Sequence, residues 1–223
     1  MSTVPKKTEA PGFAVETVSR KPQQNRSHAS LERMLVAARE LMLERGEDFT
    51  LQEVSRRGDV SIGSIYLRFE SKENLVRAVI ANALDDVARD EEDMCERVRE
   101  SASSLAELVP AYVHAYAETL RGNASLLRLA MQRAAIDPLV SEPGKQRALQ
   151  AAKAGSEVML DYRDEFGGTD PELKASSAFH VIFATLARQL SLGSTGESVQ
   201  SYDWDLLKRE LGSMCLAYLK SPD

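Results

Sequence analysis

The 223-residue sequence contains few cysteines, few aromatic residues and no long uncharged segment. Its two cysteines, Cys95 and Cys215, form no CxxC pair, which excludes a zinc knuckle and a disulfide-rich scaffold. We expect both to be buried free thiols. The longest uncharged apolar run, residues 175–187, is shorter than the roughly 20 residues that a membrane-spanning helix needs. The sequence therefore predicts a globular protein with no membrane partner.

The sequence also lacks the motifs that mark common catalytic centres. GxSxG, GxxxxGK, HExxH and Glu-x-x-His are absent, and His28, His114 and His180 are scattered along the chain. We therefore expect no enzyme activity, no cofactor and no metal site. The first residues include Pro, Lys and Gln where a secretory signal has an apolar segment, which predicts a cytoplasmic protein.

Charge is divided unevenly along the chain, whose net charge is −6. Residues 1–77 carry 13 Lys and Arg against 11 Asp and Glu, whereas residues 78–223 carry 15 against 23. This division is typical of a protein that contacts nucleic acid at one end only. The acidic run from Asp85 to Glu100 fits a cation site, a surface that repels misplaced DNA or a solvated helix face, and the lack of paired histidines favours the solvated face.

Hydrophobic residues recur at helical spacing through most of the chain, which predicts an all-α protein. Residues 1–27, rich in Pro, Lys, Gln and Ser, are expected to form a flexible basic tail. A first helix is expected over residues 31–45, between Ser30 as N-cap and Gly46 as C-cap. Later helices are expected over residues 72–99, 103–120, 124–136, 145–165, 172–191 and 202–220, separated at Gly, Pro and Asn residues.

Residues 49–76 contain three helix starts in close succession. The N-cap signals are Thr50, which forms a capping-box pattern with Glu53, then Ser61, then Ser71. Two short helices separated at Gly58-Asp59 predict a helix-turn-helix, whose second helix enters the major groove of DNA. The spacing predicts a small core that joins these helices to the first one, formed by Val54, Val60, Ile65 and Phe69.

The second short helix keeps a free face for DNA. We expect base, backbone or phosphate contacts there from Ile62, Gly63, Ser64, Tyr66 and Arg68. Lys72 stands at the start of the long helix, where free backbone amides favour a phosphate. Arg20 and Lys21 are expected in the neighbouring minor groove.

This segment resembles the DNA-binding domain of the tetracycline-repressor (TetR) family of bacterial transcription regulators. The matching residues are Phe49-Thr50, Val60-Ser61, Gly63-Ser64-Ile65-Tyr66, Phe69, Ser71-Lys72 and Leu75, over a similarity that covers about residues 30–80. The resemblance implies phosphate or backbone contacts from Thr50, Ser61, Tyr66 and Lys72, and base contacts from Gly63 and Ser64. It also implies an amino-terminal three-helix bundle, residues 28–76, and a larger helical domain, residues 77–223, for effector binding and dimerisation.

Members of the family pair through their last two long helices. The expected interface residues of this chain are Phe179, Ile182, Phe183, Leu186, Leu207, Leu211, Met214 and Tyr218, which form stripes at helical spacing. The same stripes also fit an intramolecular core.

The resemblance implies a small-molecule effector in the carboxy-terminal domain. Residues that could line its cavity are Tyr112, Tyr116, Met131, Met159 and Tyr162, with Phe166 beside them and His114 as a polar contact. Ordinary core packing explains the same aromatic and Met residues.

These observations predict a homodimeric regulator that binds palindromic double-stranded DNA. We expect a repressor that a small-molecule effector of unknown identity releases from its operator. The alternative is a helical ligand-binding or adaptor protein without DNA-binding activity, which would explain the amphipathic stripes but not the three closely spaced caps.

Overall fold

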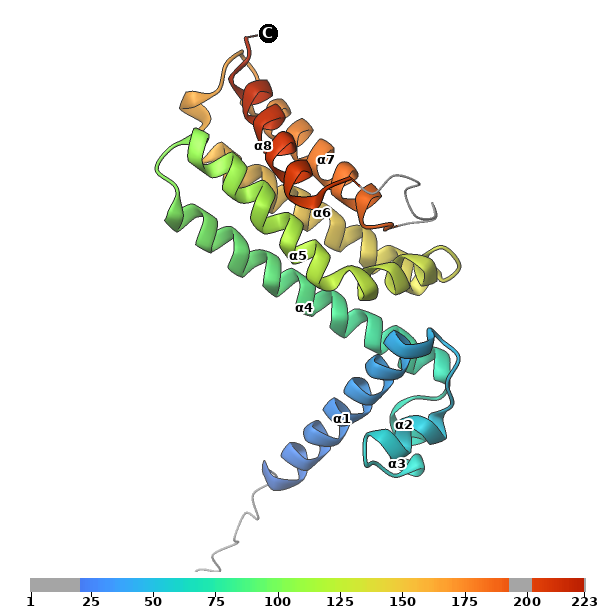
Figure 1. Ribbon diagram of the computed structural model, residues 1–223. Helices are drawn as coiled ribbons and strands as arrows, with labels where there is room; N and C mark the ends of the chain where they lie inside the picture. Colours follow the sequence, from blue (N-terminus) through green and yellow to red (C-terminus); the bar gives the residue numbers. More distant parts are fainter. Residues whose placement is uncertain (1–20, 193–201, 223) are drawn as a thin grey trace, which may run out of the picture.

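The computed structural model describes residues 21–192 and 202–222, and within these ranges the chain is all helical, as the periodicity predicts (Figure 1). It forms eight α-helices, one short 3-10 helix and no strand there. The helices are α1 (Lys21–Arg45), α2 (Leu51–Arg57), α3 (Ile62–Arg68), α4 (Lys72–Ser101), α5 (Leu105–Ala134), α6 (Pro138–Leu160), η1 (Arg163–Glu165), α7 (Pro171–Gln189) and α8 (Trp204–Lys220). None of the helices in the described part is long and apolar enough to span a membrane.

Two hydrophobic cores organise these helices. The smaller core joins α1, α2 and α3 to the first turns of α4 and includes Met34, Val54, Ile65 and Phe69. The larger core fills a bundle formed by the rest of α4 with α5, α6, α7 and α8. Figure 1 shows α4 running from the amino-terminal unit along the bundle. One continuous helix therefore contributes side chains to both cores.

The helix starts of the amino-terminal unit follow the sequence prediction. Thr50 and Glu53 form the capping box, and the hydroxyl groups of Ser61 and Ser71 accept hydrogen bonds from the backbone N–H groups of Ser64 and Asn74. Gly46, with φ of +63°, ends α1 and donates to the Met42 carbonyl. These caps satisfy backbone groups that helix ends leave unpaired, so they fix where each helix begins or ends.

The turn between α2 and α3 depends on two adjacent residues with different tasks. Asp59 adopts φ of +47°, a left-handed conformation that Asp tolerates better than most residues. Gly58 is buried against α1, where a Cβ atom would lie 2.9 Å from the Arg33 carbonyl oxygen and 3.3 Å from the Ala37 Cβ. Gly58 therefore permits the close approach of the turn to α1, while Asp59 reverses the chain.

Several predicted helix boundaries differ from the structure. Helix α1 begins at Lys21, so Ser30 is an interior residue and not an N-cap. Helix α5 continues through Gly122-Asn123, where a break was expected, and α6 continues through Pro143-Gly144. A helical glycine costs only about 1 kcal/mol, and α5 outweighs this cost by burying twelve side chains along its length. Tertiary packing therefore overrides these local breaking signals.

Candidate functional site

Helix α3 buries Ile65 and leaves its other residues exposed or partly exposed. Ile65 is completely buried, which fixes the rotation of the helix about its axis. Gly63 is exposed, and Tyr66 and Leu67 expose 54% and 88% of their surface. Ile62 and Ser64 are partly buried. The structure therefore brings the predicted base-facing residues of α3 to one surface of the amino-terminal unit.

The hydroxyl groups predicted to contact the phosphate backbone already have partners within the chain. Ser61 Oγ lies 2.7 Å from Ser64 Oγ and accepts from the Ser64 N–H at 3.1 Å. Thr50 Oγ1 donates to Glu53 Oε2 at 3.0 Å and accepts from the Glu53 N–H at 3.3 Å. The hydrogen bond from the Thr50 N–H, with further donation from Arg45 and the Thr50 hydroxyl, lowers the pKa of Glu53 to about 2. This carboxylate therefore keeps the start of α2 fixed at any physiological pH.

The cationic side chains of Arg68 and Lys72, which were predicted to contact DNA, also have partners within the chain. Arg68 Nη2 donates to the Ser27 carbonyl oxygen at 2.7 Å and to Ser27 Oγ at 2.6 Å, which ties α3 to the start of α1. Lys72 Nζ donates to the Glu47 carbonyl oxygen and lies 4.7 Å from the centre of the Phe49 ring. Arg20 lies outside the described residues, and only the backbone of Lys21, at the start of α1, is described.

Two further exposed residues of the helix-turn-helix were not predicted from the sequence. Leu67 follows Tyr66 and lies on the side of α3 opposite the buried Ile65. Residues two positions apart point to opposite sides of a helix, so the sequence could have indicated that Leu67 is exposed. Arg56 on α2 is exposed and has no hydrogen bond or ion pair with another described residue. A basic residue at the end of a short helix gives no sequence signal that distinguishes a DNA contact from a solvated side chain.

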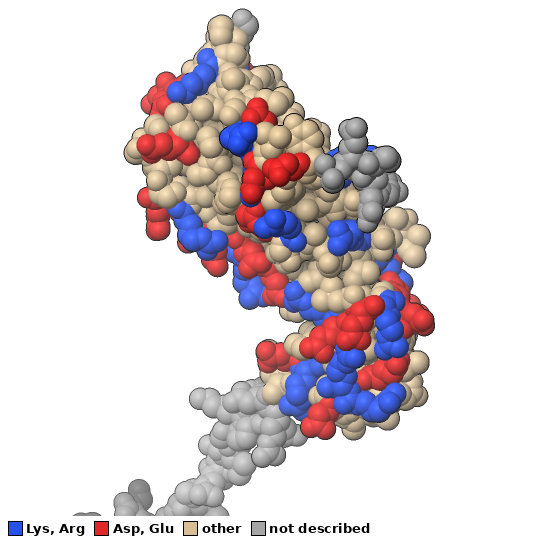
Figure 2. Space-filling model, viewed as in Figure 1, with Lys and Arg blue, Asp and Glu red and all other residues tan. Residues whose placement is uncertain are grey.

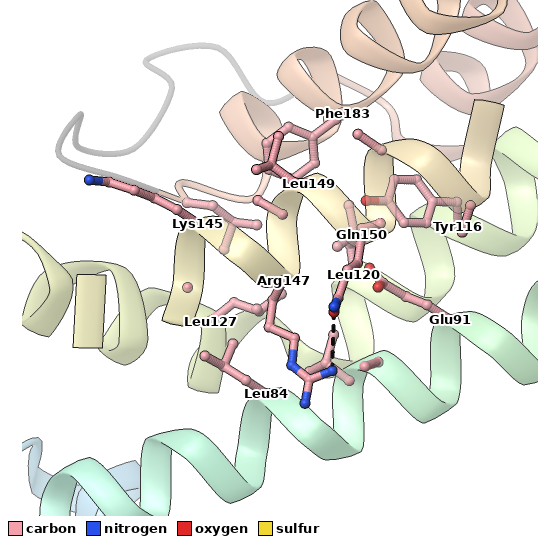
Figure 3. Close-up of a pocket in the computed structure, with 18 of the residues that line it drawn as sticks. Leu84, Glu91, Tyr116, Leu120, Leu127, Lys145, Arg147, Leu149, Gln150 and Phe183 are labelled. Atoms are coloured by element: carbon pink, nitrogen blue, oxygen red, sulfur yellow. Dashed lines mark hydrogen bonds between the residues drawn. The ribbon is translucent and has the colours of Figure 1, made fainter. Parts of the chain in front are cut away.

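A cavity of about 800 Å³ lies within the carboxy-terminal bundle, between α4, α5, α6 and α7 (Figure 3). Tyr112, Tyr116 and Met131, which the sequence suggested as cavity residues, line it. Met159 and Tyr162 do not: Met159 is completely buried in the core, and the Tyr162 hydroxyl donates to the Ala102 carbonyl oxygen at 2.7 Å. His114 is exposed and is also absent from the cavity lining.

Four aromatic rings form one wall of the cavity. The rings of Tyr112 and Tyr116 stack with centroids 5.6 Å apart, and Tyr116 lies 5.7 Å from Phe179, which lies 6.4 Å from Phe183. Gly155 on α6 makes room for this wall, because a Cβ atom there would lie 2.3 Å from the Tyr112 hydroxyl and 2.4 Å from Phe179 Cδ2. Burial raises the pKa of both tyrosines, so both stay neutral.

Two carboxylates line this cavity, the exposed Glu92 and the partly buried Glu91. Glu91 extends from α4, and Figure 3 shows its carboxylate pointing into the cavity on the side where Tyr116 and Gln150 lie. Burial, reinforced by the like charges of Asp90 and Glu92, raises the pKa of Glu91 to about 7. Glu91 has no hydrogen bond or ion pair with another described residue. The acidic run is therefore mostly a solvated helix face from which one member turns inward.

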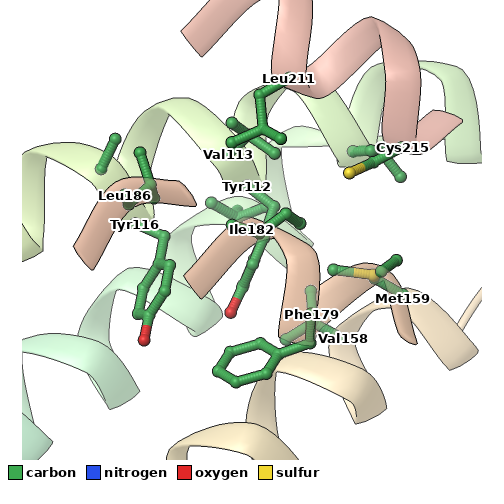
Figure 4. Close-up of a cluster of buried hydrophobic side chains, with 14 of the residues drawn as sticks. Tyr112, Val113, Tyr116, Val158, Met159, Phe179, Ile182, Leu186, Leu211 and Cys215 are labelled. Carbon is green, nitrogen blue, oxygen red and sulfur yellow. The ribbon is translucent and has the colours of Figure 1, made fainter. Parts of the chain in front are cut away.

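The stripes expected at a subunit interface are divided between the core and the surface. Phe179, Ile182, Leu186 and Leu211 are at most 5% exposed and pack in the core of the bundle, which Figure 4 shows together with Tyr112 and Tyr116. This corrects their expected role, because side chains buried within one chain cannot contact a partner. Phe183 and Leu207 are partly buried, whereas Met214 and Tyr218 expose 65% and 41% of their surface.

The amino-terminal unit and the bundle are joined by a group of four charged residues. Asp137, only 4% exposed, accepts hydrogen bonds from Arg77 on α4 at 2.8 Å and from Arg133 on α5 at 3.0 Å. Arg133 also pairs with Glu47, in the loop between α1 and α2, at 2.8 Å. The residues Met131, Ala134, Val140 and Ser141, on either side of Arg133 and Asp137 in the chain, line the cavity. This ion-pair group therefore lies between the cavity and the helix-turn-helix.

Comparison with known proteins gives a family match for the helix-turn-helix segment and a fold for the chain as a whole. Residues 34–79 match the family model described as bacterial regulatory proteins, tetR family. No curated protein matches the chain. A putative TetR-family transcriptional regulator from Mesorhizobium loti MAFF303099 has a similar structure, with a TM-score of 0.69 and 19% identity over 87% of this chain and 96% of that chain.

Two further structures have the same fold. A transcriptional regulator from Cytophaga hutchinsonii ATCC 33406 has a TM-score of 0.63 and 19% identity over 86% of this chain and 100% of that chain. The TetR-family transcriptional regulator PfmR from Thermus thermophilus has a TM-score of 0.57 and 16% identity over 85% of this chain and 100% of that chain. At these identities the likeness establishes the fold alone, and the family match concerns the helix-turn-helix segment. Residues 34–79 therefore have the helix-turn-helix of the tetR family of bacterial regulatory proteins, within a chain that has the fold of solved TetR-family regulators.

Proposed function

We propose that this protein is a DNA-binding transcriptional regulator of the tetR family. In this proposal it is a homodimeric repressor, acting in the cytoplasm, that leaves a palindromic operator when a small molecule occupies the cavity of the carboxy-terminal bundle. The observation that carries the proposal is the position of the ion-pair group of Glu47, Arg77, Arg133 and Asp137 between that cavity and the helix-turn-helix. A ligand can release DNA only if it favours one arrangement of the protein over another.

The structure supports a specific route for that coupling. Cavity residues flank Arg133 at the end of α5 and Asp137 at the start of α6, so a ligand that displaces this junction changes the geometry of both ion pairs. Arg77 lies on α4, five residues after Lys72, and Glu47 precedes the helix-turn-helix. A shift of these partners changes the orientation of α3, and the two α3 helices of a dimer then no longer match successive major grooves about 34 Å apart.

The DNA contacts in this proposal divide into two groups. The exposed face of α3 contacts bases through Gly63, Ser64, Tyr66 and Ile62, with Leu67 added from the structure. Phosphates are contacted by Thr50, Ser61, Arg68, Lys72 and the unpaired Arg56. Arg20 and Lys21 remain proposed minor-groove contacts. Apolar side chains and small residues in the groove favour contact with thymine methyl groups.

The proposed dimer forms through the surface that α7 and α8 leave exposed. The apolar side chains on it are Leu173, Val181, Met214 and Tyr218, between 41% and 65% exposed. Lys174 on α7 lies 5.5 Å from the centre of the Tyr218 ring on α8, which makes the two helices one continuous surface there. Exposed apolar surface of this kind is typical of a contact with a partner.

Selection of random duplex DNA by the purified protein tests this function. We expect a palindromic motif, bound by a dimer, whose affinity falls as salt concentration rises. Tyr66→Ala is expected to weaken binding to that motif at least about tenfold, because a groove-facing side chain is lost. The matched control is Tyr202→Ala, since Tyr202 is 50% exposed but precedes α8. A folded protein that enriches no motif, or equal effects of the two substitutions, would contradict the proposal.

A further inference from the structure

The cavity combines an aromatic wall with two carboxylates, the partly buried Glu91 and the exposed Glu92, neither of which has a hydrogen bond or ion pair with another described residue. Its lining is mainly apolar, and the rings of Tyr112, Tyr116, Phe179 and Phe183 form a continuous row along it. Glu91 points into this space and makes no ion pair or hydrogen bond with another described residue. A buried carboxylate without a partner is unfavourable unless a cation or hydrogen-bond donor reaches it.

The position of Glu91 on its helix shows that it belongs to the buried face. It lies four residues after Val87 and four before Cys95, and both of these residues are at most 6% exposed. Residues four apart share a helix face. A hydrophobic side chain is the usual residue on a buried helix face. Solvation of the outer face of α4 therefore does not explain why a carboxylate stands at this position.

The positive charges of the lining do not neutralise Glu91. Arg147 on α6 pairs with Asp85 and donates to Gln150 at 3.3 Å, and Lys145 pairs with Glu142 at 3.6 Å. His180 on α7 is exposed. An anionic ligand would therefore find both permanent cations already paired and would meet the negative potential of Glu91 and of the neighbouring Asp90 and Glu92.

We propose that the effector is an organic ammonium ion with an apolar, preferably aromatic, body, whose charge pairs with Glu91 while its body packs on the rings of Tyr112, Tyr116 and Phe179. This inference rests on the ligand-responsive function proposed above and names the chemical class of its ligand. An ammonium group gains a charge-assisted hydrogen bond from Glu91 and cation–π contact with the tyrosine rings. A volume of about 800 Å³ accommodates a drug-sized molecule.

A matched series of probes tests the inference. 4-Phenylbutylamine, 4-phenylbutan-1-ol and 5-phenylpentanoate share the same phenylbutyl body and differ only in the polar end. Their binding to the full-length protein is measured by isothermal titration calorimetry at pH 8, where Glu91 is mostly ionised. We expect the amine to bind at least about tenfold more tightly than the alcohol, and the carboxylate to bind most weakly. Equal or tighter binding of the alcohol or carboxylate, or no binding of the amine, overturns the inference.

Two variants locate the charge. Glu91→Gln keeps the shape and polarity of the side chain and is expected to reduce the preference for the amine over the alcohol to within about twofold. The control is Glu96→Gln, an exposed residue on the same helix outside the cavity, which is expected to retain the preference. If Glu91→Gln retains it, the site assignment is wrong. Circular dichroism confirms that both variants fold, and the comparison of probes on the unmodified protein stands without either of them.

Proton release gives a second readout. Pairing with an ammonium ion favours the ionised form of Glu91, so at pH 6.5 amine binding is expected to release protons, measured from the dependence of the binding heat on the buffer. Binding of the amine without proton release from Glu91 overturns the inference. Fluorescence anisotropy with the selected operator separates this question from the proposed function. If the amine binds with the expected preference but leaves operator affinity unchanged, the ligand class stands and ligand-induced release fails.

Discussion

The carboxylate of Asp137 accepts a hydrogen bond from Nε of Arg77, 60 residues earlier in the chain, at 2.8 Å. Asp137 is also the N-cap of α6, where its Oδ1 accepts from the Leu139 N–H at 3.1 Å. One side chain therefore fixes the start of a helix that borders the cavity and pairs with the helix that leaves the DNA-binding unit. The hydrogen bond from Arg77 lowers the pKa of Asp137, so the carboxylate stays charged at neutral pH.

Asp137→Asn tests whether this contact couples the two regions. Asn is an equally good N-cap, so α6 is expected to start at the same residue while the ion pairs with Arg77 and Arg133 are lost. We expect the effect of a bound ligand on operator affinity to fall at least about fivefold, measured by anisotropy with and without ligand. Asp161→Asn is the control, because it removes an ion pair with Arg99 far from the DNA-binding unit. Equal loss of coupling in both variants would argue against the route.

The raised pKa of Glu91 makes the stability of the protein depend on pH. The folded protein holds this proton up to a pKa of about 7, whereas an unfolded Glu releases it near 4.5, so folding binds protons between these values. Stability from this group is therefore complete below about pH 4.5 and is lost as pH rises through 7. The loss is about 2 kcal/mol once partial solvent access through the cavity is allowed for.

Urea unfolding of the unmodified protein and of Glu91→Gln across pH 5–8 measures the pH-dependent contribution of Glu91 to the free energy of unfolding. The other titratable or charged groups that face or surround Glu91 are Asp90, Glu92 and Cys95 on α4, Tyr112 and Tyr116 on α5, Lys145 and Arg147 on α6, and His180 on α7. Both proteins contain all of these groups, so their direct contributions cancel in the difference between the two unfolding free energies. We expect Glu91→Gln to gain relative stability as pH rises. A difference that is flat with pH would show that Glu91 is solvated in the folded state.

Gly58→Ala tests the close approach of the turn to α1. A Cβ atom would lie 2.9 Å from the Arg33 carbonyl oxygen, which is part of the backbone and cannot move freely. We expect a loss of about 1–3 kcal/mol in unfolding free energy, seen as a lower melting temperature by circular dichroism.

Gly63→Ala is the matched control for this substitution. A Cβ atom there meets nothing within 4 Å, so alanine is expected to stabilise α3 by about 0.5–1 kcal/mol while weakening operator binding if the backbone approaches the groove. If Gly58→Ala is as stable as Gly63→Ala, the packing argument for Gly58 does not hold.

Met214→Glu tests the proposed surface for dimer formation. The side chain is 65% exposed on α8, so the fold is expected to tolerate the substitution, whereas a charge buried between subunits would raise the dimer dissociation constant at least about tenfold. Sedimentation velocity measures the change. Leu67→Glu, at an even more exposed position on α3, is expected to remain dimeric and to lose operator binding instead. A dimeric Met214→Glu protein would place the interface elsewhere.

The features predictable from the sequence were those encoded by neighbouring residues. Thr50, Ser61 and Ser71 cap helices through side chains that reach only three residues along the chain, so the helix-turn-helix could be predicted with its boundaries. The stripe of Phe179, Ile182 and Leu186 was different. Helical spacing shows which face of a helix is buried, but an apolar stripe is the same whether the covering surface belongs to one chain or two.

The role of Glu91 could be predicted only in part from the sequence. Its spacing from Val87 and Cys95 placed it on the buried face of α4, yet the many charged residues of the same acidic run surround it and obscure this signal. Only the arrangement of α5, α6 and α7 creates the space that it faces. The same arrangement keeps α5 helical through Gly122-Asn123, so both features depend on contacts between residues distant in the sequence.

The partnered cations of the amino-terminal unit limit the positive charge that it offers to DNA. Arg57 pairs with Glu44, Arg45 pairs with Glu53 at 3.1 Å, and Figure 2 shows Lys and Arg interspersed with Asp and Glu over this unit. Non-specific attraction to DNA depends on cations that replace counterions along the phosphates. Because Arg45 and Arg57 pair with carboxylates of the same unit, fewer of its cations are free to replace counterions, and we expect its non-specific attraction to DNA to depend only weakly on salt concentration.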